Sequence, residues 1–319
     1  MFFKNFKVWE TEFAGRKLSV ETGKMAGLAN ASVMVRYGDT NVLCTVTASA
    51  KPREGVDFFP LSVDYEEKMY SVGRIPGSFQ RREGRASEKA ILTSRCIDRP
   101  IRPLFPKDLR NDCSVVATVM SVDPDCSPEI AAMIGVSTAI AISDIPWDGP
   151  ISGVNVGLVD GEIVLNPTLE QRAKTDLNLT VASTADLVAM IEAGGNEISD
   201  DLMFDCIMAG HEENKKIVKF IQGIVDEIGK PKFAYESSDP DPDIMKEIED
   251  FCIEDVKKAL DTDDKLVRDE ARYTRLFTRN LMRDSRAMRA RSRRLCILFR
   301  STLFAHGSRT STRESTAEA

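Results

Sequence analysis

The first fifty residues alternate between apolar and polar side chains, and this alternation constrains the fold more than any other feature. It is visible in the runs VWETEF, KLSVETG, ASVMVRY and NVLCTVTA, with turn signals at Ala14-Gly15 and Gly38-Asp39. A period of two places alternate side chains on opposite faces of a strand. We therefore predict a β-meander from Phe3 to Ser49 whose sheet has one buried face.

Helix signals follow the meander. Ser87 has the character of an N-cap for a helix to about Asp98, and Pro100 is predicted to end that helix. Ser127 and Pro128 are typical of the start of a second helix, EIAAMIGVSTAIAIS, which is almost wholly apolar. Because it has no polar face, this helix is predicted to be packed on both sides.

Short strands and one long helix complete the first 230 residues. The order of sheet first and mixed elements afterwards predicts an α+β domain over about residues 3–230. The strands are expected at Phe58–Tyr65, Cys113–Val122, Val154–Val159, Glu162–Leu165, Leu177–Ala182 and Leu187–Ile191, and an amphipathic helix from Ser199 to about Gly229.

Charge divides the chain into an acidic body and a basic tail. Residues 265–319 carry 14 Lys/Arg and 5 Asp/Glu, whereas residues 1–264 carry 29 and 45. The seven cysteines are scattered without a CxxC pair, which favours reduced thiols. The N-terminus lacks an apolar signal core and no stretch reaches the roughly 18 apolar residues of a membrane helix. A cytoplasmic protein with no membrane association is expected.

A basic island interrupts the acidic body. Residues 74–110 contain ten Lys/Arg and four Asp/Glu, enough to attract a polyanion locally. Arginine forks suit phosphate oxygens, and Phe79 beside Arg81 and Arg82 offers a face on which an unpaired base can stack. We interpret the island as a binding site for single-stranded RNA. The alternative is an ordinary solvated charged loop.

The run GRIPGSFQRREGRASEKAILTSRCIDRPIRPLF resembles a segment of the bacterial polynucleotide phosphorylase (polyribonucleotide nucleotidyltransferase) family, in its first RNase PH-like repeat. The similarity extends from Phe2 to about Leu266. It implies a first RNase PH-like domain with a mixed sheet and packed helices over residues 1–234, a linker over 235–243, and the start of an all-α domain over 244–267.

The resemblance also implies a function. The family members are phosphate-dependent 3′ to 5′ exoribonucleases that release nucleoside diphosphates during mRNA degradation. They use Mg²⁺ and inorganic phosphate, form homotrimers in the cytoplasm and join RNA-degradation complexes. In this chain, Gln80 stands where the family usually has a second aromatic residue. The residues expected to bind RNA are Phe79, Gln80, Arg81, Arg82 and Arg85, with Arg95, Arg99 and Arg102 as further contributors. The alternative for these last three is that Glu88 and Asp98 neutralise them on the surface.

The catalytic positions of the family belong to the second repeat, and their counterparts here are degenerate. Cys126-Ser127-Pro128 replaces a serine run that opens a helix. Glu170 and Asp176 keep a six-residue carboxylate spacing, but Asn178 and Thr180 stand where the family has Asp and Lys. No catalytic residue and no bound Mg²⁺ or phosphate is therefore expected in this chain. The alternative is that Glu170 and Asp176 form a residual metal or acid/base pair.

Two other groups of titratable residues have structural explanations. Asp123, Asp125 and Glu129 surround a predicted helix start, where capping accounts for them. His211 lies in a predicted helix without a partner nucleophile and is expected to be structural.

Residues 268–319 form an arginine-rich tail that the resemblance does not cover. We interpret it as a non-native or disordered end of a truncated or frame-shifted product. The rival interpretation is a basic RNA-binding arm. For the chain as a whole, two alternatives remain: a self-contained phosphorolytic enzyme using Glu170 and Asp176, or a non-enzymatic RNA-binding or assembly subunit.

Overall fold

The computed structural model describes residues 5–53, 55–56, 58–235 and 237. The predicted linker, all-α segment and tail lie outside these residues, apart from Tyr235 and Ser237. The strands are β1 (Lys7–Phe13), β2 (Arg16–Thr22), β3 (Ala31–Tyr37), β4 (Thr40–Pro52), β5 (Leu61–Glu67), β6 (Asn111–Ser121), β7 (Ser152–Val159), β8 (Glu162–Leu165), β9 (Leu177–Ser183) and β10 (Val188–Gly195). The helices are α1 (Glu88–Ile101), α2 (Pro128–Ile142), α3 (Leu169–Arg172) and α4 (Asp200–Ile228), with 3₁₀ turns η1 (Met69–Val72) and η2 (Arg102–Leu104).

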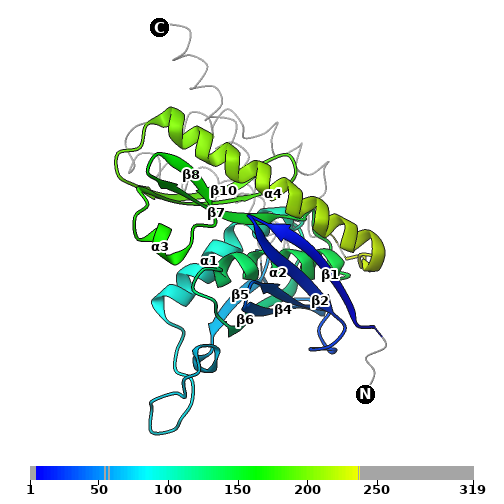
Figure 1. Ribbon diagram of the computed structural model, residues 1–319. Coiled ribbons are helices and arrows are strands. Elements are labelled where there is room, and N and C mark those ends of the chain that lie inside the picture. Colours follow the sequence, from blue (N-terminus) through cyan, green and yellow to red (C-terminus); the bar gives the residue numbers. More distant parts are fainter. Residues whose placement is uncertain (1–4, 54, 57, 236, 238–319) are drawn as a thin grey trace, which may run out of the picture. The chain divides into compact units, whose positions relative to one another are not determined.

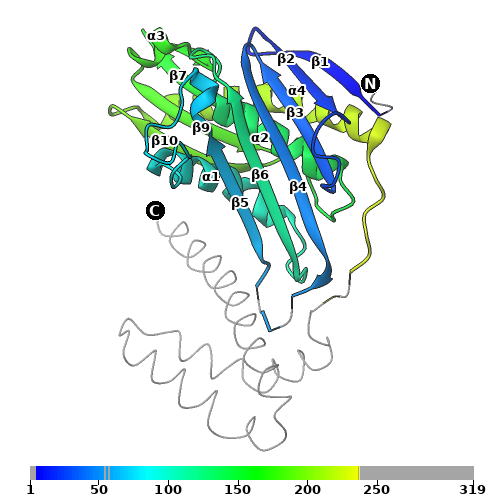
Figure 2. The same ribbon diagram turned by 90° about the horizontal axis from the view of Figure 1, so that it is seen from below.

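The predicted meander forms most of a six-stranded sheet in the order β1-β2-β3-β4-β6-β5. All neighbouring strands are antiparallel except β5 and β6, which are parallel. The turn between β1 and β2 places Ala14 and Gly15 at φ values of 46° and 74°, which explains its Ala-Gly sequence. Figure 2 shows the strands of this sheet side by side with α2 behind them.

Helix α2 lies between this sheet and a second one (Figure 1). On one side a Cβ at Gly135 would stand only 2.6 Å from the Sγ atom of Cys44 in β4, so glycine permits the close approach. On the other side, a Cβ at Gly153 of β7 would meet Met133 of α2 at 2.2 Å. Packing on both sides explains why the α2 sequence has no polar face, as predicted.

The second sheet has the order β10-β9-β7-β8 and is antiparallel throughout. Its β7–β8 hairpin turns at Asp160 and Gly161, with φ values of 52° and 83°, as the Asp-Gly dipeptide predicted. Helix α4 begins after its N-cap Ser199 and covers this sheet, with Gly210 packed against Val154 and Val156. The α+β prediction is therefore confirmed over the described residues.

The segment after α4 ties the chain back to the C-terminus of α2. The Nζ atom of Lys232 donates hydrogen bonds to the carbonyl oxygens of Ala141 and Ser143, at 2.9 and 2.8 Å, and more weakly to that of Ile140 at 3.3 Å. The Ala141 and Ser143 carbonyl groups lie at the helix end, where no further helical amide follows to pair with them, whereas Ile140 also accepts from Ser143. The Lys232 ammonium group thus supplies hydrogen-bond donors to carbonyl groups at the end of α2, and its positive charge interacts favourably with the helix dipole.

Several local predictions are wrong. Pro100 does not end α1, which continues to Ile101, so Arg102 caps the helix rather than lying beyond it. A proline in the last turn removes only one backbone bond, and the Arg102 N–H still reaches the Asp98 carbonyl. Ser127 precedes α2 but its side chain does not cap it; its hydroxyl donates to Glu129 instead. The short helix α3 was not predicted.

The cysteine prediction holds for the described residues. Cys44, Cys96, Cys113, Cys126 and Cys206 are all free thiols, and all but Cys96 are buried. None of the helices in the described ranges combines the length and the apolar character needed to cross a membrane.

Candidate nucleic-acid interface

The first part of the basic island, residues 74–87, forms a long loop between η1 and α1, and this loop projects away from both sheets (Figure 1). At its tip the Arg81 amide donates to the Ser78 carbonyl oxygen at 2.9 Å, which closes a tight turn. Arg81 has a φ of 53°, a conformation that costs a non-glycine residue about 1 kcal/mol. The turn leaves Phe79 fully exposed, at 102 %. An aromatic ring is thus presented to solvent with no apolar surface to cover it.

The basic side chains of the loop are exposed as well. Arg81, Arg82 and Arg85 have solvent-facing side chains, and so does the neighbouring Gln80. Arginines that form ion pairs within the described residues lie elsewhere, at Arg53, Arg99 and Arg102. The loop therefore combines a stacking face with guanidinium groups that carry no internal counter-charge in the described part of the chain.

The three arginines of α1 and its cap differ in their availability. Arg95 and Arg99 lie on the exposed face of α1, four residues apart as predicted, and Arg99 stands 3.6 Å from Glu192 of β10. Arg102 is engaged with Asp98 at 2.8 Å and with the Leu61 carbonyl oxygen at 3.1 Å. Arg102 thus ties α1 to β5, and Arg95 is the freest of the three.

The ends of the loop are anchored. Ser87 caps α1 as predicted, since its Oγ atom accepts a hydrogen bond from the Ala90 amide at 3.1 Å. At the other end, Gly73 adopts a left-handed conformation that closes η1, with a hydrogen bond from its amide to the Tyr70 carbonyl oxygen at 3.0 Å.

The second part of the candidate site is the N-terminus of α2, because the free backbone N–H groups at a helix start can bind an anion. Here a carboxylate of the protein itself occupies this position. Glu129, in the first turn of α2, accepts a hydrogen bond from the Ser127 hydroxyl and forms an ion pair with Lys89 of α1 at 2.9 Å. Lys89 also lies 3.9 Å from Glu67 of β5.

The pKa shifts of Glu129 and Lys89 both favour the charged forms of the two groups. Burial opposes ionisation of Glu129, but the Ser127 hydroxyl and the Lys89 ammonium outweigh it and lower the pKa of the carboxyl group. Burial likewise opposes the charge on Lys89, yet Glu129 raises the pKa of that ammonium group. The nearby Cys126 is not a nucleophile at neutral pH, because burial and Asp123 raise the pKa of its thiol to about 11.

Removing this carboxylate should have a measurable, pH-dependent cost. A carboxyl group whose pKa is lowered by folding stabilises the fold above its unfolded value, which is 4.5 for glutamate, and loses that effect as pH falls further. We expect Glu129→Gln to lower the free energy of unfolding by about 1 kcal/mol at neutral pH. Urea unfolding of the wild type and variant should show this difference shrinking toward pH 4.

A suitable control for this prediction is Glu212→Gln, since Glu212 forms an exposed ion pair with Lys215 at 2.7 Å on α4. Exposed pairs of this kind contribute little to stability, because solvent screens them. Equal effects of the two substitutions at neutral pH would contradict the assignment of a stabilising role to the α2 terminus.

The two spaced carboxylates lie on different elements. Glu170 is in α3, whose start is fixed by a capping box from Thr168 and by the Asp125 carboxylate, which accepts from the Leu169 amide at 2.8 Å. Asp176 precedes β9 and accepts from Asn196 at 3.3 Å. Both carboxylates are exposed. Among the acidic residues near the start of α2, Asp125 therefore caps α3 rather than α2.

The positions expected to be degenerate have other partners. The Thr180 hydroxyl donates to Asn155 at 2.9 Å within the second sheet, and Asn178 is exposed on the adjacent part of β9. Within the described residues, His, Cys, Asp and Glu side chains form no group of three that could hold a metal ion. His211 is buried on α4, as a structural histidine would be.

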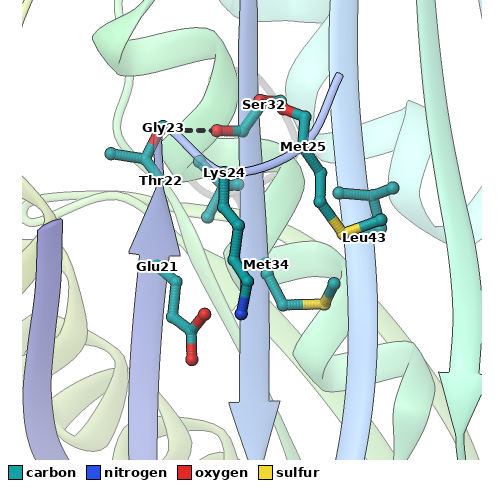
Figure 3. A pocket seen from close by; sticks show the side chains of 9 residues that line it. Glu21, Thr22, Gly23, Lys24, Met25, Ser32, Met34 and Leu43 are labelled. Carbon is teal, nitrogen blue, oxygen red and sulfur yellow. Dashed lines mark hydrogen bonds between the residues drawn. The ribbon is translucent and has the colours of Figure 1, made fainter. Parts of the chain in front are cut away.

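A small surface pocket lies on the other side of the fold, at the end of the β2–β3 connection (Figure 3). Its lining includes Glu21, Lys24 and Met34, and the Thr22 hydroxyl donates to the Ser32 carbonyl oxygen at 2.7 Å beside it. The cavity of about 50 Å³ holds a few water molecules at most. It is no candidate for a polymer-binding site.

Comparison with known families shows which family this chain belongs to. The pattern described as "3′ exoribonuclease family, domain 1" matches residues 14–146, and "3′ exoribonuclease family, domain 2" matches residues 149–213. Together they cover more than half of the chain. The chain belongs to the 3′ exoribonuclease family.

Curated relatives of this exoribonuclease-family chain carry one name. The polyribonucleotide nucleotidyltransferase of Ruminiclostridium cellulolyticum is 61 % identical over 264 residues, and that of Clostridioides difficile 56 % over 264 residues. Each alignment covers 83 % of this chain but only 38 % of the relative. The chain thus spans well under half the length of these relatives, and the resemblance to the N-terminal part of a polynucleotide phosphorylase is confirmed.

A solved structure supports the fold of this family member. Rice (Oryza sativa) Rrp46 superimposes with a TM-score of 0.52 at 16 % sequence identity, covering 70 % of this chain and 96 % of that one. At this identity the likeness concerns the fold alone, and it confirms the RNase PH-like architecture predicted from the sequence.

Sequence reasoning missed the Lys89–Glu129 pair at the start of α2. Glu129 was noticed as part of an acidic cluster, but its partner lies 40 residues earlier in a different helix. The available signal was a carboxylate directly after Pro128, at the predicted start of a helix. That signal identifies the acid without revealing the lysine that neutralises it.

Proposed function

We propose that this chain is the RNA-guiding N-terminal part of a polyribonucleotide nucleotidyltransferase. The whole protein would be a phosphate-dependent 3′ to 5′ exoribonuclease that releases nucleoside diphosphates from mRNA in the cytoplasm. It would act as a homotrimer, alongside other RNA-degradation proteins, with Mg²⁺ and inorganic phosphate bound outside this chain. The family membership and the names of the relatives support this proposal.

One observation carries the RNA-guiding role: a protruding turn with a fully exposed Phe79 beside exposed Arg81 and Arg82. A solvated aromatic ring has no structural purpose at this position, since it contacts no core. Stacking of an unpaired base on such a ring contributes about 1–3 kcal/mol, and it tolerates any base sequence. Arg85 and Arg95 would extend the basic surface from the loop onto α1, with Arg99 as a further contact and Arg102 mainly as a tether.

The proposed absence of a catalytic centre in this chain rests on the α2 terminus and on β9. Phosphorolysis needs an inorganic phosphate beside the scissile diester and a metal to offset charge on the oxygens. Glu129 places a negative charge where a helix start would otherwise hold phosphate, and Pro128 removes one backbone N–H there. With Asn178 and Thr180 on β9, Glu170 and Asp176 lack the further carboxylate and the lysine of the family pattern.

Photocrosslinking to a single-stranded RNA containing 4-thiouridine tests the RNA-guiding role. We expect crosslinked peptides to map to residues 75–85, with Phe79→Ala lowering the yield at the tip of the loop. Leu28→Ala is a matched control, because Leu28 is an equally exposed apolar side chain on the β2–β3 connection.

Crosslinks spread evenly over the surface, or lost equally in Phe79→Ala and Leu28→Ala, would contradict the proposal. They would favour the other interpretation of the island as a solvated charged loop.

A further inference from the structure

One acidic residue of the basic loop, Glu83, is exposed, yet its carboxylate contacts the start of η1. The carboxylate of Glu83 accepts a hydrogen bond from the backbone amide of Met69, with an Oε1–N distance of 2.8 Å. Met69 is the first residue of η1, at the opposite end of the loop from Ser87. The contact therefore bridges the outgoing and returning arms of the loop.

The surroundings of the Met69 amide favour a carboxylate as its hydrogen-bond acceptor. Lys68 at the N-cap of η1 has no side-chain hydrogen bond to the turn, so the Met69 amide depends on a partner from elsewhere. Lys68 itself forms an ion pair with Glu66 at 2.7 Å. Glu66, with a smaller contribution from Glu83, raises the pKa of the Lys68 ammonium group. Glu83 thus has both a backbone donor and a nearby positive charge.

The rest of the loop has few internal constraints. The outgoing arm is held at its base, where the Arg74 amide donates to the Met69 carbonyl oxygen at 3.0 Å. Farther along, the contacts are the Ser78–Arg81 turn and a weak hydrogen bond from the Ser78 hydroxyl to the Arg82 carbonyl oxygen, at 3.4 Å. These contacts shape the tip, but they do not attach it to the fold. Each unrestrained residue of such a loop keeps conformational entropy that is lost when RNA binds and orders it.

We infer that Glu83 is a positioning residue for RNA: it ties the returning arm of the loop to η1 and so holds the Phe79–Arg82 turn in one place. This inference rests on the proposed RNA-guiding function. Pre-ordering would let Phe79 and the two arginines engage one strand together rather than one at a time.

Electrostatics alone predicts the opposite effect, which makes the inference testable. A carboxylate among phosphate-binding arginines repels RNA, so removing its charge should strengthen binding about twofold. If Glu83 positions the loop, losing its hydrogen bond should instead weaken binding about fivefold, as expected for one hydrogen bond of average strength. The two explanations therefore differ in sign.

Three variants of the full 319-residue chain separate charge from position. Glu83→Gln removes the charge but keeps an acceptor oxygen, Glu83→Ala removes both, and Glu88→Gln removes a charge elsewhere in the basic segment. Binding of fluorescent oligo(U) would be measured as a function of salt. We expect Glu83→Ala alone to bind more weakly and to have a shallower salt slope, while both glutamine variants bind at least as tightly as wild type.

Trypsin provides a readout without RNA, because Arg81, Arg82 and Arg85 are cleavage sites in the loop. Cleavage there should be about fivefold faster in Glu83→Ala than in Glu83→Gln, in line with the loss of one such bond. Equal cleavage rates in these two variants, or equal RNA affinity despite faster cleavage in Glu83→Ala, would overturn the inference. If wild type itself bound no RNA, the proposed function would fail, and trypsin would still report whether Glu83 holds the loop.

Discussion

Replacing Arg81 and Arg82 together with alanine should weaken binding of single-stranded RNA roughly 50-fold at about 50 mM salt. Each arginine that neutralises a phosphate contributes about 0.7 to the slope of log affinity against log salt, so the double variant should lose about 1.4 of that slope. Both side chains are exposed at the projecting turn. Fluorescence anisotropy with oligo(U) over a salt series measures affinity and slope together.

Lys215→Ala with Lys219→Ala is the matched control, because it removes the same charge from the outer surface of α4. A general effect of net charge would lower RNA affinity equally in both double variants. An unchanged slope in the Arg81/Arg82 variant would mean that the loop is a solvated surface and touches no phosphate. Since Arg81 adopts a positive φ, Arg81→Gly with Arg82→Ala checks that the turn itself is preserved.

The purified chain should release no nucleoside diphosphate from 3′-labelled RNA in the presence of Mg²⁺ and inorganic phosphate, even where it binds that RNA. The Glu129 carboxylate, paired with Lys89, occupies the start of α2 that a phosphate would need, and Glu170 and Asp176 lie on α3 and directly before β9. A full-length relative such as the Clostridioides difficile polyribonucleotide nucleotidyltransferase serves as the positive control. Thin-layer chromatography of the products is a direct measurement.

Phosphate-dependent release by this chain would contradict the proposal, and two variants would then show its origin. Loss of release in Glu170→Gln or Asp176→Asn would identify a self-contained enzyme that uses these carboxylates. Release that persists in both variants would point to a contaminating nuclease. RNA binding and release are scored on the same samples, so a failure of one is not mistaken for a failure of the other.

Local sequence patterns predicted most elements of the described domain. The strands of the meander, the β7–β8 hairpin and the long helix α4 all lie close to where alternation, Asp-Gly and Ser199 placed them. These features depend on neighbouring residues, since turn chemistry and capping act within a few positions. The prediction that Pro100 ends α1 was wrong because tertiary packing outweighs the local effect of the proline. Helix α1 buries Ile97 and Ile101 in the core, and this packing keeps its last turn helical.

The candidate site was predictable in part. Composition indicated the basic loop, and the resemblance predicted altered catalytic positions, but neither showed which side chains make internal contacts. Arg102 was expected to bind RNA, yet Asp98 and the Leu61 carbonyl oxygen hold its guanidinium group. Asp125 was explained as a cap for α2, but its carboxylate reaches the Leu169 amide and caps α3. The RNA-binding role of the loop stays a prediction.

By itself, the sequence determined the α+β class, the family and the location of the basic loop, because periodicity and motif identity are properties of contiguous residues. Only the tertiary structure decided which partners the charged side chains of the site have. It pairs Lys89 with Glu129, Arg99 with Glu192 and Glu83 with the Met69 amide. Such pairings depend on distances of a few ångströms between elements far apart in the chain, and electrostatic interactions at that range are invisible to any local pattern.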